Sequence, residues 1–434
     1  MDRDLVAFGG FVAMFALMAV RVPIGVAMGI VGVAGFALLT KFGTAMNLLA
    51  TVPLSVLTDY NLSVIPMFVL MGAFASHAGM SRELYGAGLA WLGHRRGGLA
   101  LATVAACAGF SAINGSSVAT AATMTQVALP EMRRAGYEPG LSTGVIAAGG
   151  TIGIMIPPSV IFVLYGIMTE NDLGKLFAAG VVPGLLAMLG YFTVIRIIGM
   201  RNPAAMPRGE THTWAERIAT VRELWAVALL FLFVLGGIYG GIFTVQEAAG
   251  MGAAGTLLIG ILRGRLRARE IRAALVDALR VSSAIMLIVV GAYLFGYFLT
   301  ITQFTQKAVE LLVNLPISAY GVLALVMVGY LILGAVMDEL AMILLTVPIV
   351  YPAMMQLGFD PIWFGVIIVM AVTFGMICPP VGMNVFVINS IARDVPLGRI
   401  YRGTMPFIAA DVVRLVLLCA FPALSLWLPR TLGP

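Results

Sequence analysis

Long apolar segments recur along the whole chain and are separated by short polar stretches. A membrane-spanning helix needs about 20 apolar residues. We predict spanning helices at about 5–20, 24–39, 61–78, 175–199, 222–241, 245–262, 275–299 and 405–428. Residues 45–58 are less apolar and are expected to lie along the membrane interface. Within the bilayer, a single spanning segment can satisfy the hydrogen bonds of its own backbone only as a helix. The repeated apolar segments therefore predict an all-α polytopic membrane protein.

Two further pairs of apolar segments are shorter, and each pair encloses a polar tip. In the first pair, segments 97–111 and 117–132 flank the tip at 114–117, and arginines stand beyond both outer ends. The second pair and its tip are at 319–336, 340–357 and 337–339. Each segment is too short to cross the bilayer comfortably. Because basic residues mark both ends of the first pair, the chain is expected to enter and leave on one face. We therefore predict two re-entrant helical hairpins.

A span interrupted by two prolines follows each hairpin. The halves of the first are 141–156 and 159–169, around Pro157 and Pro158. The halves of the second are 361–376 and 382–392, around Pro379 and Pro380. Proline removes a backbone donor and frees a carbonyl upstream, so these spans are expected to stay broken. Short amphipathic stretches at 82–93 and 305–316 precede the hairpins and are predicted to be arms lying in the membrane plane.

The two hairpins and their broken spans are copies of one another. A shift of 222 positions takes Pro130 to Pro352 and Pro158 to Pro380, so no gap is needed between these points. The same shift matches further pairs: Met132 with Met354, Gly136 with Gly358, Pro139 with Pro361, Gly153 with Gly375, Pro157 with Pro379, and Asp172 with Asp394. Proline and glycine in register arise by chance far less often than apolar matches, and internal repeats are common in transporters. The protein is therefore interpreted as a duplicated one.

The positions of lysine and arginine predict the orientation of the copies. Basic loops are expected in the cytoplasm; they are Arg21, 94–96, 133–134, 196–222, 263–272 and the group Arg393, Arg399 and Arg402. Five predicted crossings separate the two hairpins. Because five is odd, the first hairpin enters from the cytoplasm and the second from the opposite face, which makes the repeats inverted. Both termini are then predicted to be periplasmic.

Composition agrees with a membrane protein and narrows the function. The 434 residues are 61% hydrophobic and 11% charged, against about 25% charged in a soluble domain. The net charge of +6 comes from arginines at helix ends, so it does not indicate nucleic-acid binding. The three cysteines and three histidines show no disulfide or metal-ligand spacing. There is no Gly-Lys-Ser/Thr phosphate loop, so ATP is not expected to drive the protein.

Hairpins that stop within the membrane point to transport. Unpaired backbone groups are tolerated there only where they line a cavity or bind something. Helix N-termini can hold an anion, and unwound carbonyl groups can hold Na⁺. The hairpins could instead be packing elements, and a channel is disfavoured because two hairpins occlude a pore. No enzyme is expected, because Asp338 has no partner aspartate in a like motif and no histidine stands near Ser116.

Five stretches resemble signatures of a known family. They are GSSVATAA, GGTIGIMIPPS with VLYG, GIFTVQEAAGMGA, LILGAVMDELAMILLTVPI and FGMICPPVGMNVFV. Together, in order and along essentially the whole chain, they resemble the large membrane subunit of tripartite ATP-independent periplasmic (TRAP) transporters, the DctM type. The resemblance implies an elevator-type secondary transporter of the bacterial inner membrane that carries an organic acid anion with Na⁺ and needs no other cofactor. It also implies two protein partners, a small four-helix membrane subunit and a periplasmic substrate-binding protein.

Two departures from the family pattern stand out. Glu339 occupies a position where the family often has a small or hydroxyl residue, and TVQEA replaces the usual TPTEA. Glu339 makes the ion and substrate site less typical, and it could ligate an ion or cap the hairpin. An ion-coupled carboxylate symporter that works without partners, from a related inverted-hairpin family, is the alternative. The substrate is left open among C4-dicarboxylates, sialic acid and other sugar or keto acids.

The resemblance divides the chain into fixed and moving parts. Scaffold helices with an arm are expected at 1–95 and 173–318, and a last scaffold helix at 395–434. The transport domain is expected to combine 96–172 with 319–394, that is, each hairpin with its broken helix.

Three groups of residues are the candidate site. A first Na⁺ site is predicted from hydroxyl and carbonyl oxygens of Asn114, Gly115, Ser116, Ser117, Gly149, Thr151 and Gly153. A second, related by the repeat, comprises Met337, Asp338, Glu339, Thr373, Gly375 and Cys378. Substrate contacts are expected at Pro157, Pro158, Ser159, Pro379, Pro380 and Asn384. A hard monovalent cation suits such oxygen ligands, although the same Asn, Ser and Asp side chains are also good helix N-caps.

Overall fold

The computed structural model describes residues 3–334 and 337–432, and this part of the chain is helical without any strand. Within these described ranges, six helices are long and apolar enough to cross a membrane, or up to eight if two bent helix pairs each count as one span. The helices before the first broken span are α1 (Arg3–Ala19), α2 (Ile24–Leu39), α3 (Phe42–Thr58), the short η1 (Asn61–Ser63), α4 (Val64–His77), α5 (Met80–Leu92), α6 (Gly98–Asn114) and α7 (Ser117–Arg134). The prediction of an all-α polytopic membrane protein is confirmed.

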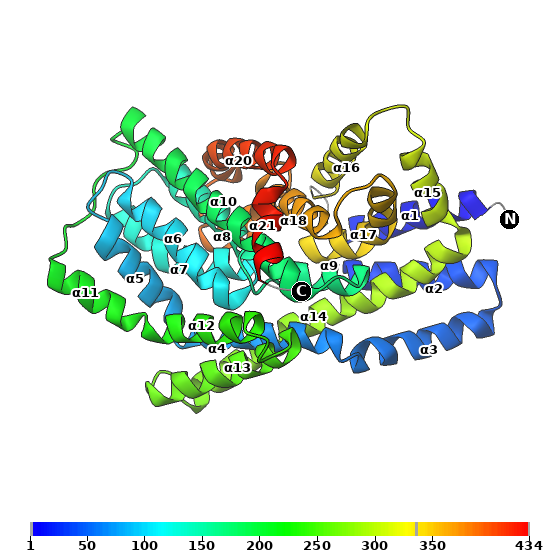
Figure 1. Ribbon diagram of the computed structural model, residues 1–434, viewed down its shortest axis with the longest axis horizontal. Coiled ribbons are helices and arrows are strands. Elements are labelled where there is room, and N and C mark those ends of the chain that lie inside the picture. Colours follow the sequence, from blue (N-terminus) through cyan, green and yellow to red (C-terminus); the bar gives the residue numbers. More distant parts are fainter. Residues whose placement is uncertain (1–2, 335–336, 433–434) are drawn as a thin grey trace.

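The remaining helices follow the predicted order. They are α8 (Pro139–Met155), α9 (Val160–Thr169), α10 (Leu173–Arg201), α11 (Trp214–Glu223), α12 (Trp225–Tyr239), α13 (Val245–Leu262), α14 (Ala268–Thr302), α15 (Phe304–Val313), α16 (Ala319–Gly334), α17 (Glu339–Gln356), α18 (Pro361–Ile377), α19 (Met383–Ile391), α20 (Leu397–Ala420) and α21 (Ala423–Thr431). Figure 1 shows hairpin α6–α7 and hairpin α16–α17 on either side of the central helices α8, α9 and α18.

The repeat found in the sequence reappears in the helix boundaries. Helices α7 and α8, moved forward by 222 positions (117 to 339, 139 to 361), coincide with α17 and α18 at both ends. Glu138 and Asp360 are the N-caps of α8 and α18, and both accept hydrogen bonds from backbone N–H groups of the first turn. Gly136 and Gly358, just before these caps, both have positive φ, +77° and +85°. The matched prolines and glycines therefore mark equivalent turns and helix starts.

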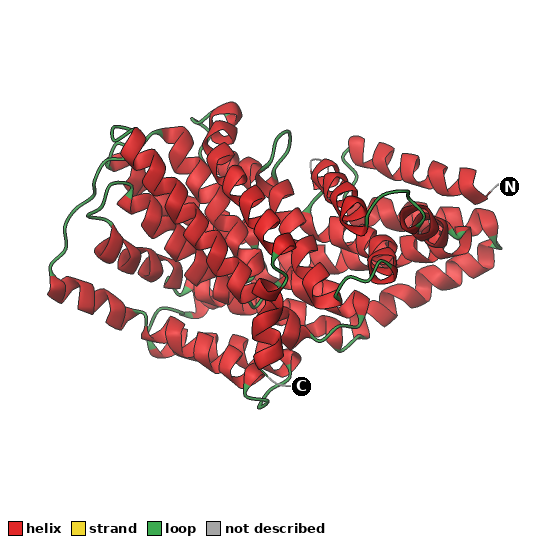
Figure 2. Cartoon of the chain, turned by 45° about the horizontal axis from the view of Figure 1, so that its top comes forward, coloured by secondary structure: helices red, strands yellow, loops and turns green. Residues whose placement is uncertain are grey.

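Two of the predicted elements differ in the structure. No element is predicted between the spans at 175–199 and 222–241, but Thr213 and Glu216 form a capping box that starts α11 there. The prediction of one last helix over 405–428 is wrong. The helix begins at Leu397, and the chain is divided near Phe421 and Pro422 into α20 and α21. Proline cannot donate within a helix, which explains the division. Figure 2 shows how little of the chain is left as loop between the helices.

Close backbone contact holds the helices at the N-terminal end together. A Cβ atom added to Gly25 of α2 would lie 2.6 Å from the carbonyl oxygen of Leu287 in α14, and one added to Gly32 would lie 2.6 Å from the carbonyl carbon of Leu294. Such small residues let helices approach without intervening side chains, which is typical of packing in membranes. In Figure 1, α2 and α14 accordingly run side by side.

Candidate cation and substrate site

The tip of hairpin 1 (α6–α7) turns through Gly115 and lies against the break between α8 and α9. Gly115 has a φ of +63°, and a Cβ atom there would lie 2.5 Å from the carbonyl oxygen of Pro158. Ser116 caps α7 by accepting a hydrogen bond from the N–H of Ala119 at 3.4 Å. The capping interpretation of the polar tip is therefore correct for this serine, whose carbonyl oxygen also accepts the hydrogen bond from the N–H of Thr120 at 3.1 Å.

Glycines of α8 bring its backbone close to the same tip. A Cβ atom on Gly153 would lie 3.4 Å from the Ser116 carbonyl oxygen, and one on Gly150 would lie 3.2 Å from that of Ser117. Gly150 therefore lies close to the tip, although the candidate groups include only its neighbour Gly149. Gly149 instead faces Cys107 of α6, whose sulfur would be 2.8 Å from an added Cβ.

Asn114 and Asn384 add two amide side chains to this tip. The Asn114 Nδ2 atom donates to Thr120 Oγ1 at 3.4 Å. Asn384, at the start of α19 and fully buried, donates from Nδ2 to Ser117 Oγ at 2.7 Å and to the Ala147 carbonyl at 3.0 Å. Its Oδ1 atom is buried and has no hydrogen-bond partner within the described chain. A buried acceptor without a donor is costly, so this oxygen is free to ligate a cation beside Ser117.

Asn384 shows that residues of the two repeats meet. α19, from the second repeat, packs on α7 of hairpin 1, and α9, from the first repeat, packs on α17 of hairpin 2 (α16–α17). Sequence spacing predicted both broken helices. It did not indicate that each broken helix packs on the hairpin of the other repeat, because the Asn384–Ser117 contact joins residues far apart in the chain.

The tip of hairpin 2 combines two carboxylates with a close backbone contact. Asp338 is the N-cap of α17, and its Oδ1 atom accepts hydrogen bonds from the N–H groups of Leu340 at 2.9 Å and Ala341 at 3.0 Å. Glu339 is 8% exposed. A Cβ atom on Gly334, at the end of α16, would lie 2.6 Å from Cα of Gly375 in α18. The hairpin thus touches its own broken helix through two glycines.

The other predicted residues of the second cation site are engaged differently. Thr373 is buried and donates to the Met370 carbonyl of its own helix at 2.6 Å. Met337 is buried, whereas Cys378, which ends α18, is half-buried. The carboxylates of Asp338 and Glu339 are left as the side-chain oxygen candidates in this group.

The proline pairs at the two breaks have different surroundings. Pro157 and Pro158 are buried, and Ser159 caps α9 by accepting from the N–H of Phe162 at 3.4 Å. Pro380 is exposed, and its carbonyl accepts from the Tyr401 hydroxyl at 2.7 Å. Both Pro-Pro bonds are cis. The second break is therefore the more accessible of the two.

A buried polar network lies behind the first cation group. Thr151 Oγ1 and the Tyr191 hydroxyl are 3.2 Å apart, and that hydroxyl donates to Asp411 Oδ2 at 2.7 Å. Arg414 pairs with Asp411 at 2.8 Å, and both are almost fully buried. Tyr191, Asp411 and Arg414 are buried residues of this network that the three candidate groups do not include. The Thr151 side chain thus points away from the hairpin, toward α10 and α20.

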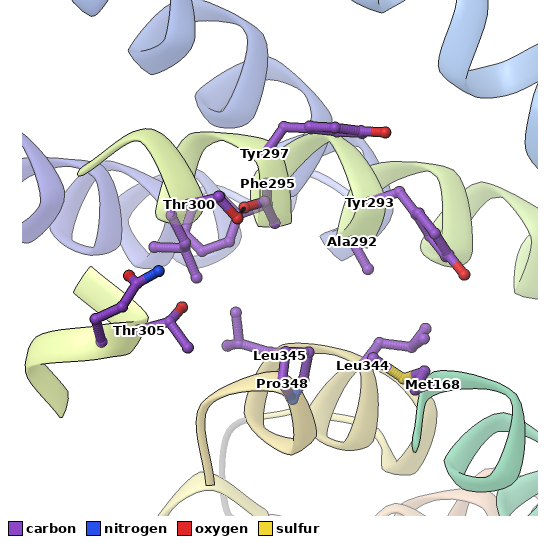
Figure 3. Close-up of a pocket in the computed structure, with 13 residues that line it drawn as sticks. Met168, Ala292, Tyr293, Phe295, Tyr297, Thr300, Thr305, Leu344, Leu345 and Pro348 are labelled. Carbon is purple, nitrogen blue, oxygen red and sulfur yellow. Dashed lines mark hydrogen bonds between the residues drawn. The ribbon is translucent and has the colours of Figure 1, made fainter. Parts of the chain in front are cut away.

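A cavity of about 430 Å³ lies between hairpin 2 and the helices α14 and α15. Figure 3 shows Ala292 of α14 opposite Leu344 of α17, and Thr305 of α15 opposite Leu345. None of the residues predicted as site residues lines it. It lies between an expected scaffold helix and an expected moving hairpin.

Comparison with known proteins assigns the family. The sequence model described as "Tripartite ATP-independent periplasmic transporter, DctM component" matches residues 11–424. This chain belongs to the DctM family. It is therefore a component of a membrane transporter and not an enzyme, and it has the further components of a tripartite system as partners.

Curated relatives agree with the DctM assignment along nearly the whole chain. The C4-dicarboxylate TRAP transporter large permease protein DctM of Pseudomonas aeruginosa is 40% identical over 377 residues, 86% of this chain and 87% of that protein. The protein of the same name from Rhodobacter capsulatus is 33% identical and covers 99% of both chains. The sialic acid TRAP transporter large permease protein SiaM of Vibrio cholerae is 28% identical over 97% of this chain and 98% of its own.

A solved structure has a similar fold. The YdaH transporter of Alcanivorax borkumensis, whose topology is described as unusual, superposes with a TM-score of 0.61 over 90% of each chain. At 15% identity this similarity concerns the fold alone. It supports the helical transporter architecture of this DctM chain.

One prediction concerns the turn at the tip of hairpin 1. Gly115→Ala should reduce uptake strongly, because the new methyl group meets the Pro158 carbonyl and a left-handed φ costs a non-glycine residue about 1–2 kcal/mol. Gly136→Ala is the matched control, since Gly136 also has positive φ but has nothing within 4 Å of an added Cβ. Both variants should lose some thermal stability, and only Gly115→Ala should lose uptake. Equal uptake by the two would show that the position of the tip is not critical.

Proposed function

We propose that this DctM chain imports a small organic acid across the inner membrane of a bacterium, coupled to Na⁺. The observation that carries the proposal is the meeting of hairpin 1 with the second repeat, where Asn384 contacts Ser117 and Ala147 and keeps a buried oxygen unpaired. Relatives are named for C4-dicarboxylates, sialic acid, isethionate and ectoine. These compounds share a carboxylate or sulfonate group, which defines the substrate class.

The first Na⁺ site of the proposal lies between hairpin 1 and α8. Its ligands are the carbonyl oxygens of Ser116 and Ser117, with Asn114, Gly115 and the backbone around Gly149, Thr151 and Gly153 shaping the site. The geometry adds Asn384 Oδ1 to this group, because that oxygen lies on the side chain that contacts Ser117. Neutral oxygens in a fixed arrangement suit a monovalent hard cation.

The second Na⁺ site of the proposal lies at hairpin 2, with Asp338 as its charged ligand and Met337, Glu339, Thr373, Gly375 and Cys378 around it. The substrate is held between the two tips, next to the breaks at Pro157-Pro158-Ser159 and Pro379-Pro380. The N-termini of α7 and α17 begin at the tips and offer positive dipole ends to a carboxylate.

The moving block in this proposal contains both hairpins and both broken helices. We add α10 and α20 to this moving block, although they were expected to be scaffold, because both helices contact α8 closely. Gly144 of α8 and Gly403 of α20 touch through their backbones, since a Cβ atom on Gly144 would lie 2.7 Å from Cα of Gly403. Thr151, Tyr191 and Asp411 link α8, α10 and α20 through buried hydrogen bonds. Sliding α8 past these helices would break both connections.

In this proposal the fixed part comprises the helices around α2, α4, α13 and α14, and the block moves past it as an elevator. The cavity between α14 and hairpin 2 supports this division, because it interrupts the contact that α14 and α15 make with α17. The repeats are inverted and both termini are periplasmic. The partners are a small four-helix membrane subunit and a periplasmic binding protein that delivers the acid.

Uptake by reconstituted vesicles tests this function. The chain with its small subunit, given an inward Na⁺ gradient and its loaded binding protein, should accumulate the acid. Replacing Na⁺ with K⁺ or omitting the binding protein should lower the initial rate at least tenfold. Uptake that persists without Na⁺ would contradict the assignment of both cation sites. Uptake without the binding protein would favour a stand-alone carboxylate symporter.

A further inference from the structure

Tyr191 of α10 places its hydroxyl group in the buried space between α8 and α20. The hydroxyl group donates to Asp411 Oδ2 at 2.7 Å, and it lies 3.2 Å from Thr151 Oγ1 of α8. Phe407 packs edge-on against the ring, with the two ring centroids 5.3 Å apart. Tyr191 and Thr151 are both buried. Packing and hydrogen bonding therefore fix the position of this hydroxyl group.

Thr151 lies on the side of α8 that faces away from hairpin 1. A Cβ atom added to Gly149 would lie 2.8 Å from the Cys107 sulfur of this hairpin. One added to Gly153 would lie 2.9 Å from its Ser111 hydroxyl oxygen. Each of these glycines is two residues away from Thr151, and two residues turn an α-helix by about 200°. α8 therefore presents glycines to the hairpin and a hydroxyl group to α10.

The glycine face of α8 does not by itself fix how the helix is rotated. Glycine lets two backbones come close, but it has no side chain that could interlock with hairpin 1. The proposed ligands of the first cation site are mostly backbone oxygen atoms on the two sides of this contact, so their separation changes when α8 rotates. A hydrogen bond on the opposite face of the helix can fix the rotation, and Thr151 lies on that face.

Hydrogen bonds continue from Thr151 through α8 to the tip of hairpin 1. Thr151 Oγ1 donates to the Ala148 carbonyl of its own helix at 2.7 Å. The neighbouring Ala147 carbonyl accepts from Asn384 Nδ2 at 3.0 Å, and the same Nδ2 atom donates to Ser117 Oγ at 2.7 Å. Two successive carbonyl groups of α8 thus receive side chains, one from the α10 side of the helix and one that reaches the tip.

An ion pair anchors the other end of this chain of hydrogen bonds. Asp411 and Arg414 of α20 are 2.8 Å apart and almost fully buried. Hydrogen bonds to a charged carboxylate are shorter and stronger than those between neutral groups. Asp411 therefore holds the Tyr191 hydroxyl group more firmly than a neutral acceptor would.

We propose that Tyr191 is a positioning residue for the first cation site. Its hydroxyl group, anchored on Asp411, contacts Thr151 and fixes the rotation of α8, so that the glycine face of this helix stays against the tip of hairpin 1. Tyr191 acts through α8 and does not touch the ion. The inference rests on the proposed function for the presence of Na⁺ at the tip, whereas the positioning of α8 does not depend on it.

Hydrogen–deuterium exchange of the purified complex with its small subunit, in buffer without Na⁺, tests the positioning. Tyr191→Phe should speed exchange in peptides that cover the tip, 112–120, and the middle of α8, 147–153. Thr151→Val removes the same contact from the other side and should affect the same peptides, so the test does not depend on how well Tyr191→Phe folds. Unchanged exchange in these variants would overturn the proposal.

The matched control is another buried tyrosine. Tyr165 is fully buried, and its hydroxyl group donates to the Pro361 carbonyl at 2.7 Å. Tyr165→Phe should also lower the unfolding temperature, because it leaves a buried acceptor without its donor. It should leave exchange at the tip of hairpin 1 as in the wild type. An equal change at the tip in Tyr165→Phe would show a general loss of stability and would contradict the role of Tyr191.

Na⁺ binding is the second measurement, followed as the rise in unfolding temperature when Na⁺ replaces choline. Tyr191→Phe should need about tenfold more Na⁺ for half of the maximal rise, since loss of a residue that orients metal ligands weakens binding by about 10–100-fold. Tyr165→Phe should respond to Na⁺ like the wild type. Adding Thr151→Val to Tyr191→Phe should raise the Na⁺ requirement no further, because residues that act through one contact are not additive.

The Na⁺ titration separates failure of this inference from failure of the proposed function. If Na⁺ stabilises the wild type and Tyr191→Phe equally well, or if the two substitutions weaken Na⁺ binding additively, the positioning role is wrong and the cation site stands. If Na⁺ does not stabilise even the wild type, the cation site and the role of Tyr191 in it are both wrong.

Discussion

Replacing Asp411 with leucine is expected to destabilise the protein by about 3–5 kcal/mol, because the change leaves the Arg414 guanidinium buried without its partner. Both side chains are at most 5% exposed, and Asp411 also accepts the hydrogen bond from Tyr191. The measurement is thermal unfolding in detergent, followed by intrinsic fluorescence. The double variant Asp411→Leu, Arg414→Met should recover most of the lost stability, because it removes the unpaired charge together with the pair.

The control for this experiment is another ion pair of the same chain. Arg133 and Asp394 are 2.7 Å apart, but their side chains are 41% and 66% exposed. Asp394→Ala should barely change the unfolding temperature, because solvent screens exposed pairs. If the double variant unfolds as readily as Asp411→Leu alone, hydrogen bonding and shape rather than an unpaired charge would account for the loss.

Replacing Asp338 with alanine is expected to abolish Na⁺-driven uptake while the protein stays in the membrane. Alanine removes both a proposed cation ligand and the N-cap of α17, and the loss of a cap alone costs about 1 kcal/mol. Asp338→Asn separates the two effects, since asparagine also caps helices but carries no charge. The asparagine variant should need at least tenfold more Na⁺ for half-maximal uptake, equivalent to about 1.4 kcal/mol of binding free energy.

Uptake assays over a range of Na⁺ concentrations decide between the two roles of Asp338. If Asp338→Asn matches the wild type at every Na⁺ concentration and Asp338→Ala fails, the residue serves as a cap and the charged ligand of the second cation site must be sought elsewhere. Wild-type uptake by both variants would remove Asp338 from the mechanism.

Sequence alone predicted the elements that proline and glycine define. The Pro139–Pro361 and Gly136–Gly358 matches lie at two equivalent helix starts, because proline favours the first turn and a left-handed turn favours glycine. Glu247, the acidic residue of the TVQEA stretch, forms a capping box with Thr244 at the start of α13, where the sequence predicts a span over 245–262. The division of the last span at Pro422 was missed, although proline there was a usable signal.

The contacts between distant segments could not be predicted in the same way. Nothing in the sequence near Asn384 indicates that its side chain reaches Ser117 and Ala147, since that contact depends on how two repeats pack. The direction of the Thr151 side chain is a similar case: its neighbours in sequence favour a place beside hairpin 1, but its hydroxyl group meets Tyr191. Periodicity assigns a residue to a helix, whereas the partner of a buried polar side chain is decided by tertiary packing.

The crossed packing of α9 on hairpin 2 and of α19 on hairpin 1 has a consequence for how such a protein could have arisen. The hairpin of each repeat is covered by a helix of the other repeat. An ancestral chain with one repeat would therefore have left its hairpin uncovered unless a second copy packed beside it. An interlocked pair of this kind is most simply explained by an ancestral homodimer whose genes later fused. The same contacts connect the two hairpins through α9 and α19, so in the proposed movement neither hairpin would shift without the other.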